Sequence, residues 1–266
     1  MNIKYRLETP EDYYAVEEMT RETFWSFWEE DRTICDEHLL VSKLRNAKAF
    51  VPELDYVAEM DGKIVGHIIY TKSWIETEDG ERYDTLTFGP LTVSPEYQSK
   101  GIGRALMQHS FDKAKELGYR AVIIYGIPDY YPRLGFRRAA ELGLTTADGS
   151  TFDAFLAYPL YEGALDGIRG KHDFDPVYFQ LTEEEALEFD KRFPPKEPHI
   201  ITPIDVLLKR LEPDAVKAIK EKGFKTLDYI KSQSEREIAS LPGIDAKAVE
   251  TIRAVMKEHK LPWGEK

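Results

Sequence analysis

Alternating apolar and polar side chains predict a set of long strands in the first third of the chain. Residues 55–60 and 63–75 both alternate, and the Asp61-Gly62 pair between them is typical of a tight hairpin turn. Residues 83–93 continue the pattern as a third strand. Because proline cannot donate a ladder hydrogen bond, this strand should bulge or separate from a neighbour at Gly89-Pro90. We therefore expect an antiparallel meander with one local defect.

Apolar residues at intervals of three and four predict a helix over Gly101–Leu117, which Gly118 would end. Before the meander, Asn2–Leu7 alternates as a strand, and helices are expected from about Pro10 and over Glu37–Asn46. Three further strand candidates follow the long helix, namely Ala121–Tyr125, Phe136–Ala140 and Thr151–Pro159. This order of elements predicts a mixed α/β (α+β) domain.

After this domain the pattern changes from strands to helices. We expect the α/β domain to occupy residues 1–165 and a connecting region to cover residues 166–200. The connecting region contains a helix over Glu183–Phe193, opened by a capping box, and ends in the proline-rich linker 194–198. Residues 201–266 predict a small all-α domain without strands, with helices over Ile204–Arg210, Asp214–Lys222, Thr226–Lys231, Ser234–Ser240 and Ala246–His259.

The charge of the 266-residue chain is unevenly distributed. Its formal net charge is −12, yet residues 200–266 hold 13 Lys and Arg against 11 Asp and Glu. Residues 1–199 therefore hold 23 against 37, a net charge of −14. The α/β part would repel nucleic acid and attract small cations.

Cysteine and histidine usage narrows the possible chemistry. The single cysteine, Cys35, excludes an internal disulfide, and its acidic neighbours disfavour a reactive thiolate. The six histidines are scattered without metal-ligand spacing, so no metal site is predicted. No apolar run approaches the roughly 20 residues that span a bilayer, and no apolar signal core opens the chain. We expect a cytoplasmic protein that does not bind a membrane.

A glycine-rich segment links the third strand to the long helix. Backbone N–H groups at a helix start point outward with the positive end of the dipole, and glycine lets a ligand approach closely. The segment therefore suits an anion, and it comprises Gln98, Ser99, Lys100, Gly101, Ile102, Gly103 and Arg104. It lacks the sequence features of a nucleotide P-loop and of a dinucleotide fold. Taken alone, it also fits a plain tight turn.

A second motif follows about 28 residues later. The pattern Gln98-x-x-Gly101-x-Gly103 followed by Tyr131-x-x-x-Gly135-Phe136 resembles the paired signature of the GNAT superfamily of N-acetyltransferases. The strings Val65–Ile68, Gly89–Val93 and Gly126–Phe136 are similar to its YhbS-like branch. The resemblance covers about residues 3–165. It implies a mixed, mostly antiparallel sheet flanked by helices, and transfer of an acetyl group from acetyl-CoA to a primary amine by direct attack.

The resemblance also implies roles for individual residues. The strand Leu91-Thr92-Val93 would pair with the pantetheine arm of acetyl-CoA, and the backbone of Gln98–Arg104 would hold the pyrophosphate. The thioester would enter the gap at Gly89-Pro90. Tyr131 would contact the cofactor and protonate the departing thiolate, because a phenol is protonated at neutral pH. A backbone N–H near Val93 would polarise the carbonyl.

Two features depart from the family pattern. Many members carry Asn on the strand before the tyrosine loop, where this chain has Gly126-Ile127-Pro128. No motif identifies a general base. Glu76, Asp84 and His67 lie on the central strands and are candidates, or they are ordinary strand residues. An amine that arrives through a water chain would need no base.

The acceptor end is less well defined. The aromatic cluster Phe24–Trp28 lies where the family's acceptor site is usually bordered, and Glu29-Glu30-Asp31 beside it would attract an amine. The same aromatics would also suit the core or a homodimer contact. Tyr130 is either a second functional phenol or a packing partner of Tyr131. The expected acceptor is a small-molecule or peptide amine, and acidity favours a cationic one such as a polyamine, an amino sugar or a lysine-like amine.

The C-terminal region suggests a partner-binding module. Residues 238–249 resemble a helix-hairpin-helix, and together with Gly223–Leu227 they are similar to the C-terminal domain of the bacterial RNA polymerase alpha subunit. Such motifs can bind a DNA phosphate, but a charge of +2 and Asp245 in the turn favour a protein-contact or packing role. The alternative function is therefore a non-catalytic acyl-CoA-binding sensor whose tail contacts the transcription machinery or DNA.

Overall fold

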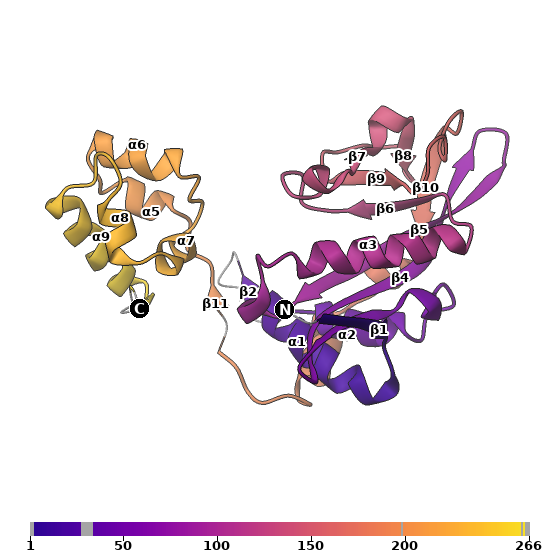
Figure 1. Cartoon of the computed structure of the whole chain (residues 1–266), viewed down its shortest axis with the longest axis horizontal. Helices are drawn as coiled ribbons and strands as arrows, with labels where there is room; N and C mark the ends of the chain where they lie inside the picture. The colour runs from indigo at the N-terminus through magenta and orange to yellow at the C-terminus, as the bar shows by residue number, and fades with distance from the viewer. Residues whose placement is uncertain (1–2, 28–33, 198, 262, 264–266) are drawn as a thin grey trace. The chain divides into compact units, whose positions relative to one another are not determined.

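The computed structural model describes residues 3–27, 34–197, 199–261 and 263 (Figure 1). Contacts between described residues divide the chain into two compact units. The first unit holds the residues up to Trp25 and those from Ile34 to Lys196. The second unit holds β2 (Ser26–Phe27) and the residues from Glu197 onward.

The first unit is built on one mixed sheet. Its main strands run in the spatial order β1 (Ile3–Leu7), β3 (Tyr56–Met60), β4 (Lys63–Thr77), β5 (Arg82–Val93), β6 (Ala121–Tyr125), β9 (Phe155–Pro159) and β7 (Arg137–Arg138). β10 (Gly170–Phe174) pairs with the far half of β4, and β8 (Leu144–Thr146) pairs with β10. The β5–β6 and β8–β10 pairs are parallel and the others antiparallel. The predicted fold class is confirmed.

Helices cover both faces of this sheet. Tyr56 and Ala58 of β3 join Leu106 of α3 (Ile102–Glu116) in the main hydrophobic core. Val57, between them, packs against residues of α1 (Tyr13–Phe24) and α2 (Glu37–Leu44). Because successive side chains of a strand point to opposite faces, α3 lies on one face and the α1–α2 pair on the other (Figure 1).

The predicted defect in β5 is confirmed. Ile68 of β4 pairs with Leu91 and Tyr70 pairs with Phe88, so Gly89 and Pro90 together face a single residue of β4. On its other side, β5 pairs with β6 only at Leu86 and Val122 within the described residues. The two strands diverge beyond that bridge. Residues 87–93 of β5 are therefore left without a strand partner on the β6 side in the described part of the chain.

The region 166–200 differs from the predicted connector. β10 forms within it, α4 (Glu183–Asp190) contacts α2, and residues up to Lys196 belong to the first unit. The sequence of β10, Gly-Lys-His-Asp-Phe, has no β-branched residue, so its composition does not predict a strand. The predicted capping box of α4 is confirmed, since the Thr182 hydroxyl accepts a hydrogen bond from the Glu185 amide.

The strand predicted over Phe136–Ala140 is shorter than expected. Only Arg137–Arg138 pair with β9, because a short 3-10 helix covers Ala139–Leu142 and has Gly143 as its C-cap. Gly143 has φ of 76°, a left-handed conformation that glycine adopts without strain.

The second unit is a small helical cluster. Its helices are α5 (Asp205–Leu208), α6 (Pro213–Glu221), α7 (Leu227–Ser232), α8 (Glu235–Ala239) and α9 (Ala246–Glu258). They enclose a core that includes Leu207, Ile219 and Ile252, and β2 pairs in parallel with β11 (His199–Ile200). Asp245 caps α9 by accepting a hydrogen bond from the Ala248 amide, 2.7 Å away. The resemblance of this unit to a helix-hairpin-helix stays a prediction.

Among the described residues, no helix has both the length and the apolar character needed to cross a membrane.

Candidate active site

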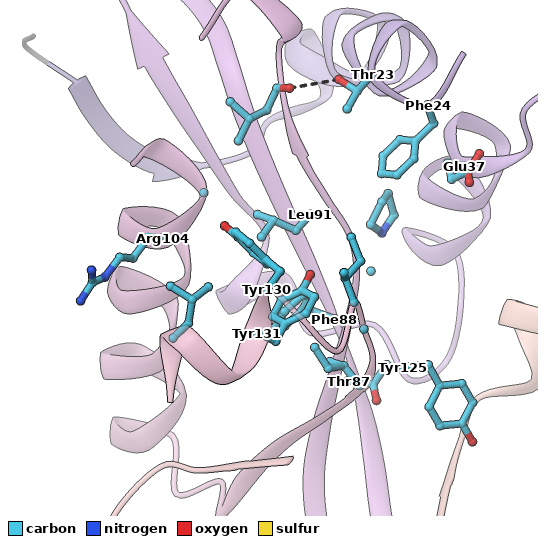
Figure 2. A pocket seen from close by; sticks show the side chains of 18 of the residues that line it. Thr23, Phe24, Glu37, Thr87, Phe88, Leu91, Arg104, Tyr125, Tyr130 and Tyr131 are labelled. Carbon is cyan, nitrogen blue, oxygen red and sulfur yellow. Dashed lines mark hydrogen bonds between the residues drawn. The ribbon is translucent and has the colours of Figure 1, made fainter. Parts of the chain in front are cut away.

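A cavity of about 1150 Å³ opens where β5 and β6 diverge. Residues 87–91 and Val93 of β5 line one wall, and residues 124–128 with Tyr130 and Tyr131 line the opposite wall (Figure 2). The first turn of α3 closes one end. The ends of α1 and α2 and the segment after β10 close the other. All of these residues belong to the first unit.

The glycine-rich segment forms the α3 end of the cavity. Gly101 is the N-cap of α3 and has φ of 83°, a conformation that disfavours any residue with a Cβ. Gly103 lies in the first turn, where an added Cβ would be 3.4 Å from Val93 Cγ2 and would fill the space beside β5. Exposed backbone amides at the start of a 15-residue helix can therefore approach an anion directly.

The predicted cofactor residues do not all line this cavity. Leu91, Val93, Gln98, Ser99, Gly101, Ile102, Gly103, Arg104 and Tyr131 line it. Thr92 is fully buried, with its hydroxyl 3.2 Å from that of Thr20. Lys100 also lies outside the lining, and its ammonium donates a 2.8 Å hydrogen bond to the Glu96 carbonyl. The side chains of Thr92 and Lys100 are therefore engaged with the protein.

Tyr131 lies in the cavity at the start of a short 3-10 helix, Tyr131–Leu134. Its ring packs 6.0 Å from that of Phe88 and 5.1 Å from that of Tyr130. Burial, with a smaller effect of Tyr130, raises the pKa of the Tyr131 phenol above its usual value. The phenol is therefore protonated at neutral pH and can donate a proton into the cavity.

Gly126, the first residue of the segment Gly126-Ile127-Pro128, has a packing reason. A Cβ built on Gly126 would lie 2.5 Å from Cδ2 of Tyr131, closer than carbon atoms can approach. The ring of Tyr131 therefore occupies the space that a side chain at position 126 would need. The departure noted in the sequence is what allows the phenol to lie here.

The three candidate bases all lie elsewhere. His67 is fully buried on β4, with Nε2 2.8 Å from Asp55 Oδ1. Glu76 and Asp84 belong to the far part of the β4–β5 hairpin, where Glu76 pairs with Arg82 and Asp84 with Trp74. None of the three lines the cavity. Glu76 and Asp84 lie at the end of these strands away from the cavity, and His67, although it pairs with Thr92 beside the cavity, directs its ring to Asp55. The alternative that all three are ordinary strand residues is therefore favoured.

His67 instead belongs to a buried ionic cluster with Glu8, Asp55 and Arg45. One carboxylate oxygen each of Glu8 and Asp55 and one ring nitrogen of His67 lie within 4.8 Å of one another. The Arg45 guanidinium donates hydrogen bonds to both carboxylate oxygens of Glu8, at 2.7 and 2.8 Å. Burial lowers the pKa of His67 to about 4 and raises the pKa of Asp55 to about 6. The carboxylates of Glu8 and Asp55 are therefore already engaged, Glu8 with the Arg45 guanidinium and Asp55 with the His67 imidazole.

The sequence did not identify Glu37 as a site residue. This first residue of α2 lines the cavity, and Figure 2 shows its carboxylate near Phe24, on the side opposite Arg104. Within the described lining, Glu37 and Arg104 are the two charged side chains. Tyr125, Phe174, Tyr178 and Phe179 also line this end and were not predicted. They come from separate segments, so no local pattern could have revealed them.

The aromatic cluster of α1 is divided between roles. Phe24 lines the cavity, whereas Trp25 is buried and lies under the Arg21 guanidinium, 4.2 Å from its ring centroid. Ser26 and Phe27 belong to β2 of the second unit. Trp28 and the acids at 29–31 lie outside the described residues. The acceptor rim expected from this cluster is therefore represented by Phe24 alone within the described cavity.

A buried ion pair fixes the helices that carry Phe24 and Glu37. Arg21 of α1 is 2% exposed and forms two hydrogen bonds with Asp190 of α4, at 2.5 and 3.0 Å. His38 of α2 places Nε2 3.2 Å from the same carboxylate. Burial raises the pKa of the neighbouring Cys35 thiol, which agrees with its predicted lack of reactivity. α1 and α4 thus share an ion pair, and α2 places the His38 imidazole beside the same carboxylate.

Comparison with known proteins agrees with the motifs. Residues 17–136 match the model of the acetyltransferase (GNAT) family. The chain is 29% identical over 165 residues to the uncharacterized N-acetyltransferase YhbS of Escherichia coli K12, which covers 62% of this chain and 92% of YhbS.

Solved structures support the same fold. The crystal structure of E. coli YhbS in complex with CoA has a TM-score of 0.58 at 26% identity, covering 68% of this chain and 94% of that chain. A GNAT family acetyltransferase from Brucella melitensis in complex with acetyl-CoA has a TM-score of 0.52 at 24% identity, covering 66% and 98%. The predicted GNAT fold is confirmed for the first unit.

Proposed function

We propose that this protein transfers the acetyl group of acetyl-CoA to a primary amine by direct attack, in line with the match of residues 17–136 to the acetyltransferase (GNAT) family model. One observation carries the proposal. A helix start with accessible amides, a strand edge without a partner among the described residues and the partly buried phenol of Tyr131 all face the same cavity.

The cavity fits the parts of acetyl-CoA. The pyrophosphate would lie against the amides of Gln98 to Arg104, because Gly101 and Gly103 leave the backbone accessible there. The pantetheine amides would pair with the free edge of β5 at Leu91–Val93. Thr92 would contribute through its backbone, since its side chain is buried on the opposite side. Acetyl-CoA supplies an activated thioester.

Two groups of the chain would then act on the reaction. The backbone N–H near Val93 would donate a hydrogen bond to the thioester carbonyl and stabilise negative charge on its oxygen. The Val93 carbonyl already accepts hydrogen bonds from the Thr23 hydroxyl and the Gln98 amide, at 3.2 and 3.1 Å, which fixes this stretch of β5. Tyr131 would give its proton to sulfur as the C–S bond breaks.

A thiol-release assay with a panel of amines tests the proposal, with acetyl-CoA affinity measured separately by calorimetry. We expect binding of acetyl-CoA, and thiol release that depends on the presence of an amine. Binding without amine-dependent release across the panel would overturn the transferase and favour the sensor. If the protein neither bound acetyl-CoA nor released thiol, the assignment of the cavity as a coenzyme A site would be wrong.

A further inference from the structure

The cavity passes through the sheet. Ile102 of α3 and Phe24 of α1 both line it. Because α3 and α1 cover opposite faces of the sheet, the space between β5 and β6 connects the two faces. In the proposed function, acetyl-CoA enters from the α3 face, where the glycine-rich segment lies, and its thioester reaches Gly89-Pro90. The acyl group would then point toward the α1–α2 face.

The side chain of Tyr178 lies on the α1–α2 face. Tyr178 belongs to a short 3-10 helix, Pro176–Phe179, that follows β10 and lines the cavity. Its hydroxyl is 3.1 Å from the Thr71 hydroxyl of β4. The residue before Thr71, Tyr70, places its hydroxyl 2.7 Å from that of Ser110 in α3. Because successive side chains of a strand alternate between faces, Thr71 and its partner Tyr178 lie on the face opposite α3.

The Tyr178 ring closes the sheet beside Gly89. A Cβ built on Gly89 would lie 3.7 Å from Cε1 of the ring, an ordinary van der Waals contact. Since a Cα–Cβ bond is about 1.5 Å long, the Gly89 Cα and this ring atom are at most about 5.2 Å apart. Carbon atoms in contact are separated by about 3.5–4.0 Å, so a ligand carbon between the two would need at least about 7 Å. No part of an acyl chain can therefore pass between Gly89 and the ring.

The Tyr178 ring is held in this position from several sides. Besides the hydrogen bond with Thr71, the ring of Phe174 lies 5.3 Å away at an interplanar angle of 79°. Phe174 is itself part of β10, which pairs with β4. The Asp175 carboxylate accepts a hydrogen bond from the Val177 amide at 3.0 Å, which fixes the turn that carries Tyr178. A longer acyl group would therefore have to displace a ring that is attached to both β4 and β10.

We propose that Tyr178 limits the length of the acyl group, so that the protein transfers acetyl in preference to longer acyl groups. The acetyl methyl would lie against the ring, and each further methylene would have to displace it. This inference rests on the proposed acetyl transfer, and it assigns a role to a residue that belongs to neither sequence motif. It concerns the donor alone and applies to any amine acceptor.

The first experiment measures affinity, which does not require turnover. The Kd values of acetyl-CoA, propionyl-CoA and butyryl-CoA are determined by calorimetry on the full chain. We expect butyryl-CoA to bind at least about 10-fold more weakly than acetyl-CoA, which corresponds to about 1.4 kcal/mol, with propionyl-CoA between them. Equal affinities for the three would overturn the role of Tyr178. Absence of binding by all three would overturn the coenzyme A site, and this inference with it.

Two variants separate the Tyr178 ring from its hydroxyl. Tyr178→Ala removes the ring, so the Kd values of butyryl-CoA and acetyl-CoA should then differ by less than about 3-fold. Tyr178 is partly buried and lies outside the main hydrophobic core, so the fold should be retained. Tyr178→Phe is the matched control, because it keeps the ring beside Phe174 and should keep most of the wild-type difference. An unchanged difference in Tyr178→Ala, or its loss in Tyr178→Phe, would contradict the ring as the limit.

A substitution on the other side of the contact should act in the opposite direction. Gly89→Ala places a methyl group 3.7 Å from the Tyr178 ring without overlap, so the fold should be retained. This methyl narrows the space beside the ring. The Kd of propionyl-CoA, divided by that of acetyl-CoA, should therefore increase about 3-fold relative to wild type. An unchanged or smaller ratio would contradict the placement of the acyl group beside Gly89 and Tyr178.

Turnover shows whether Tyr178 acts on the donor or on the acceptor. The kcat/KM for thiol release is compared between acetyl-CoA and butyryl-CoA, with the amine that gives the fastest release in the panel. We expect Tyr178→Ala to reduce the preference for acetyl-CoA at least about 5-fold, while the KM for the amine changes less than about 2-fold. A raised KM for the amine with an unchanged acyl preference would place Tyr178 at the acceptor and overturn the proposal. No amine-dependent release from any acyl-CoA would overturn the transferase, while the affinities would still decide the role of Tyr178.

Discussion

The two ends of the cavity are built in different ways. The α3 end comes from one continuous segment, residues 98–104, whose glycines and helix start are visible in the sequence. The Glu37 end is assembled from α1, α2, β6 and the segment after β10, which are far apart in the chain. In the proposed function, the first end binds an anion through backbone amides. The second presents side chains.

This difference explains why the donor is easier to infer than the acceptor. An anion held by backbone needs a particular conformation, and that conformation requires glycine at Gly101. A site made of side chains needs only that suitable residues meet in space. Such a site can change its ligand by substitution of single lining residues without altering the glycine-rich segment.

The largest effect is expected at the backbone end. Gly101→Val places a β-branched residue at φ of 83° and should move the first turn of α3, so the affinity for acetyl-CoA should fall at least about 100-fold. The matched control is Gly118→Val, at the other end of α3. Gly118 has φ of 87°, and both glycines have open space around the added Cβ. Calorimetry should therefore show loss of binding for Gly101→Val alone, and equal losses would indicate a general effect on stability.

The next largest effect should appear in the rate constant. Tyr131→Phe removes the proton donor while keeping the ring against Gly126, so kcat should fall about 100-fold with the Kd for acetyl-CoA nearly unchanged. Because burial raises the pKa of Tyr131, its ionisation should cause no loss of rate between pH 7 and 10. Tyr130→Phe should have a much smaller effect, since Tyr130 is 41% exposed and water can replace its hydroxyl. A larger loss for Tyr130→Phe would exchange the roles of the two phenols.

A smaller effect on kcat is expected when the Tyr131 ring is displaced but keeps its hydroxyl. Gly126→Ala would place its Cβ 2.5 Å from Cδ2 of Tyr131, so the ring must shift and kcat should fall about 10-fold. The double variant Gly126→Ala/Tyr131→Phe provides the check by steady-state kinetics. If Gly126 acts through Tyr131, the double variant should be hardly slower than Tyr131→Phe alone. If the loss of kcat in the double variant equalled the product of the two single losses, position 126 would act independently of Tyr131.

Features that depend on neighbouring residues could be predicted from the sequence, and features that depend on distant segments could not. Local patterns predicted α3, the β3–β4 hairpin and the defect at Gly89-Pro90, because each depends on residues that are close in sequence. β10 was missed, since its pairing with β4 and not its own composition makes it a strand. Glu37 was missed for a related reason, because its place in the cavity lining depends on distant segments that complete the wall.

The smallest effect on catalysis is expected from His172, a residue of β10 that supports the acceptor end from below its surface. His172 is 1% exposed, its ring lies 5.5 Å from that of Phe174, and neither ring nitrogen has a hydrogen-bond partner within the described residues. Burial lowers its pKa to about 3. Between this value and the usual 6.5, the unfolded chain binds a proton that the folded chain does not, so stability must fall as the pH falls through this range. At pH 5 the imidazole would lower the free energy of unfolding by roughly 2 kcal/mol relative to a residue that does not titrate.

His172→Phe should therefore raise the free energy of unfolding in urea more at pH 5 than at pH 7.5, while the Kd for acetyl-CoA stays unchanged. An equal gain in the free energy of unfolding at both pH values would show that packing, and not the titration of His172, determines stability here. A loss of stability at both pH values would show that the site has no room for the larger ring.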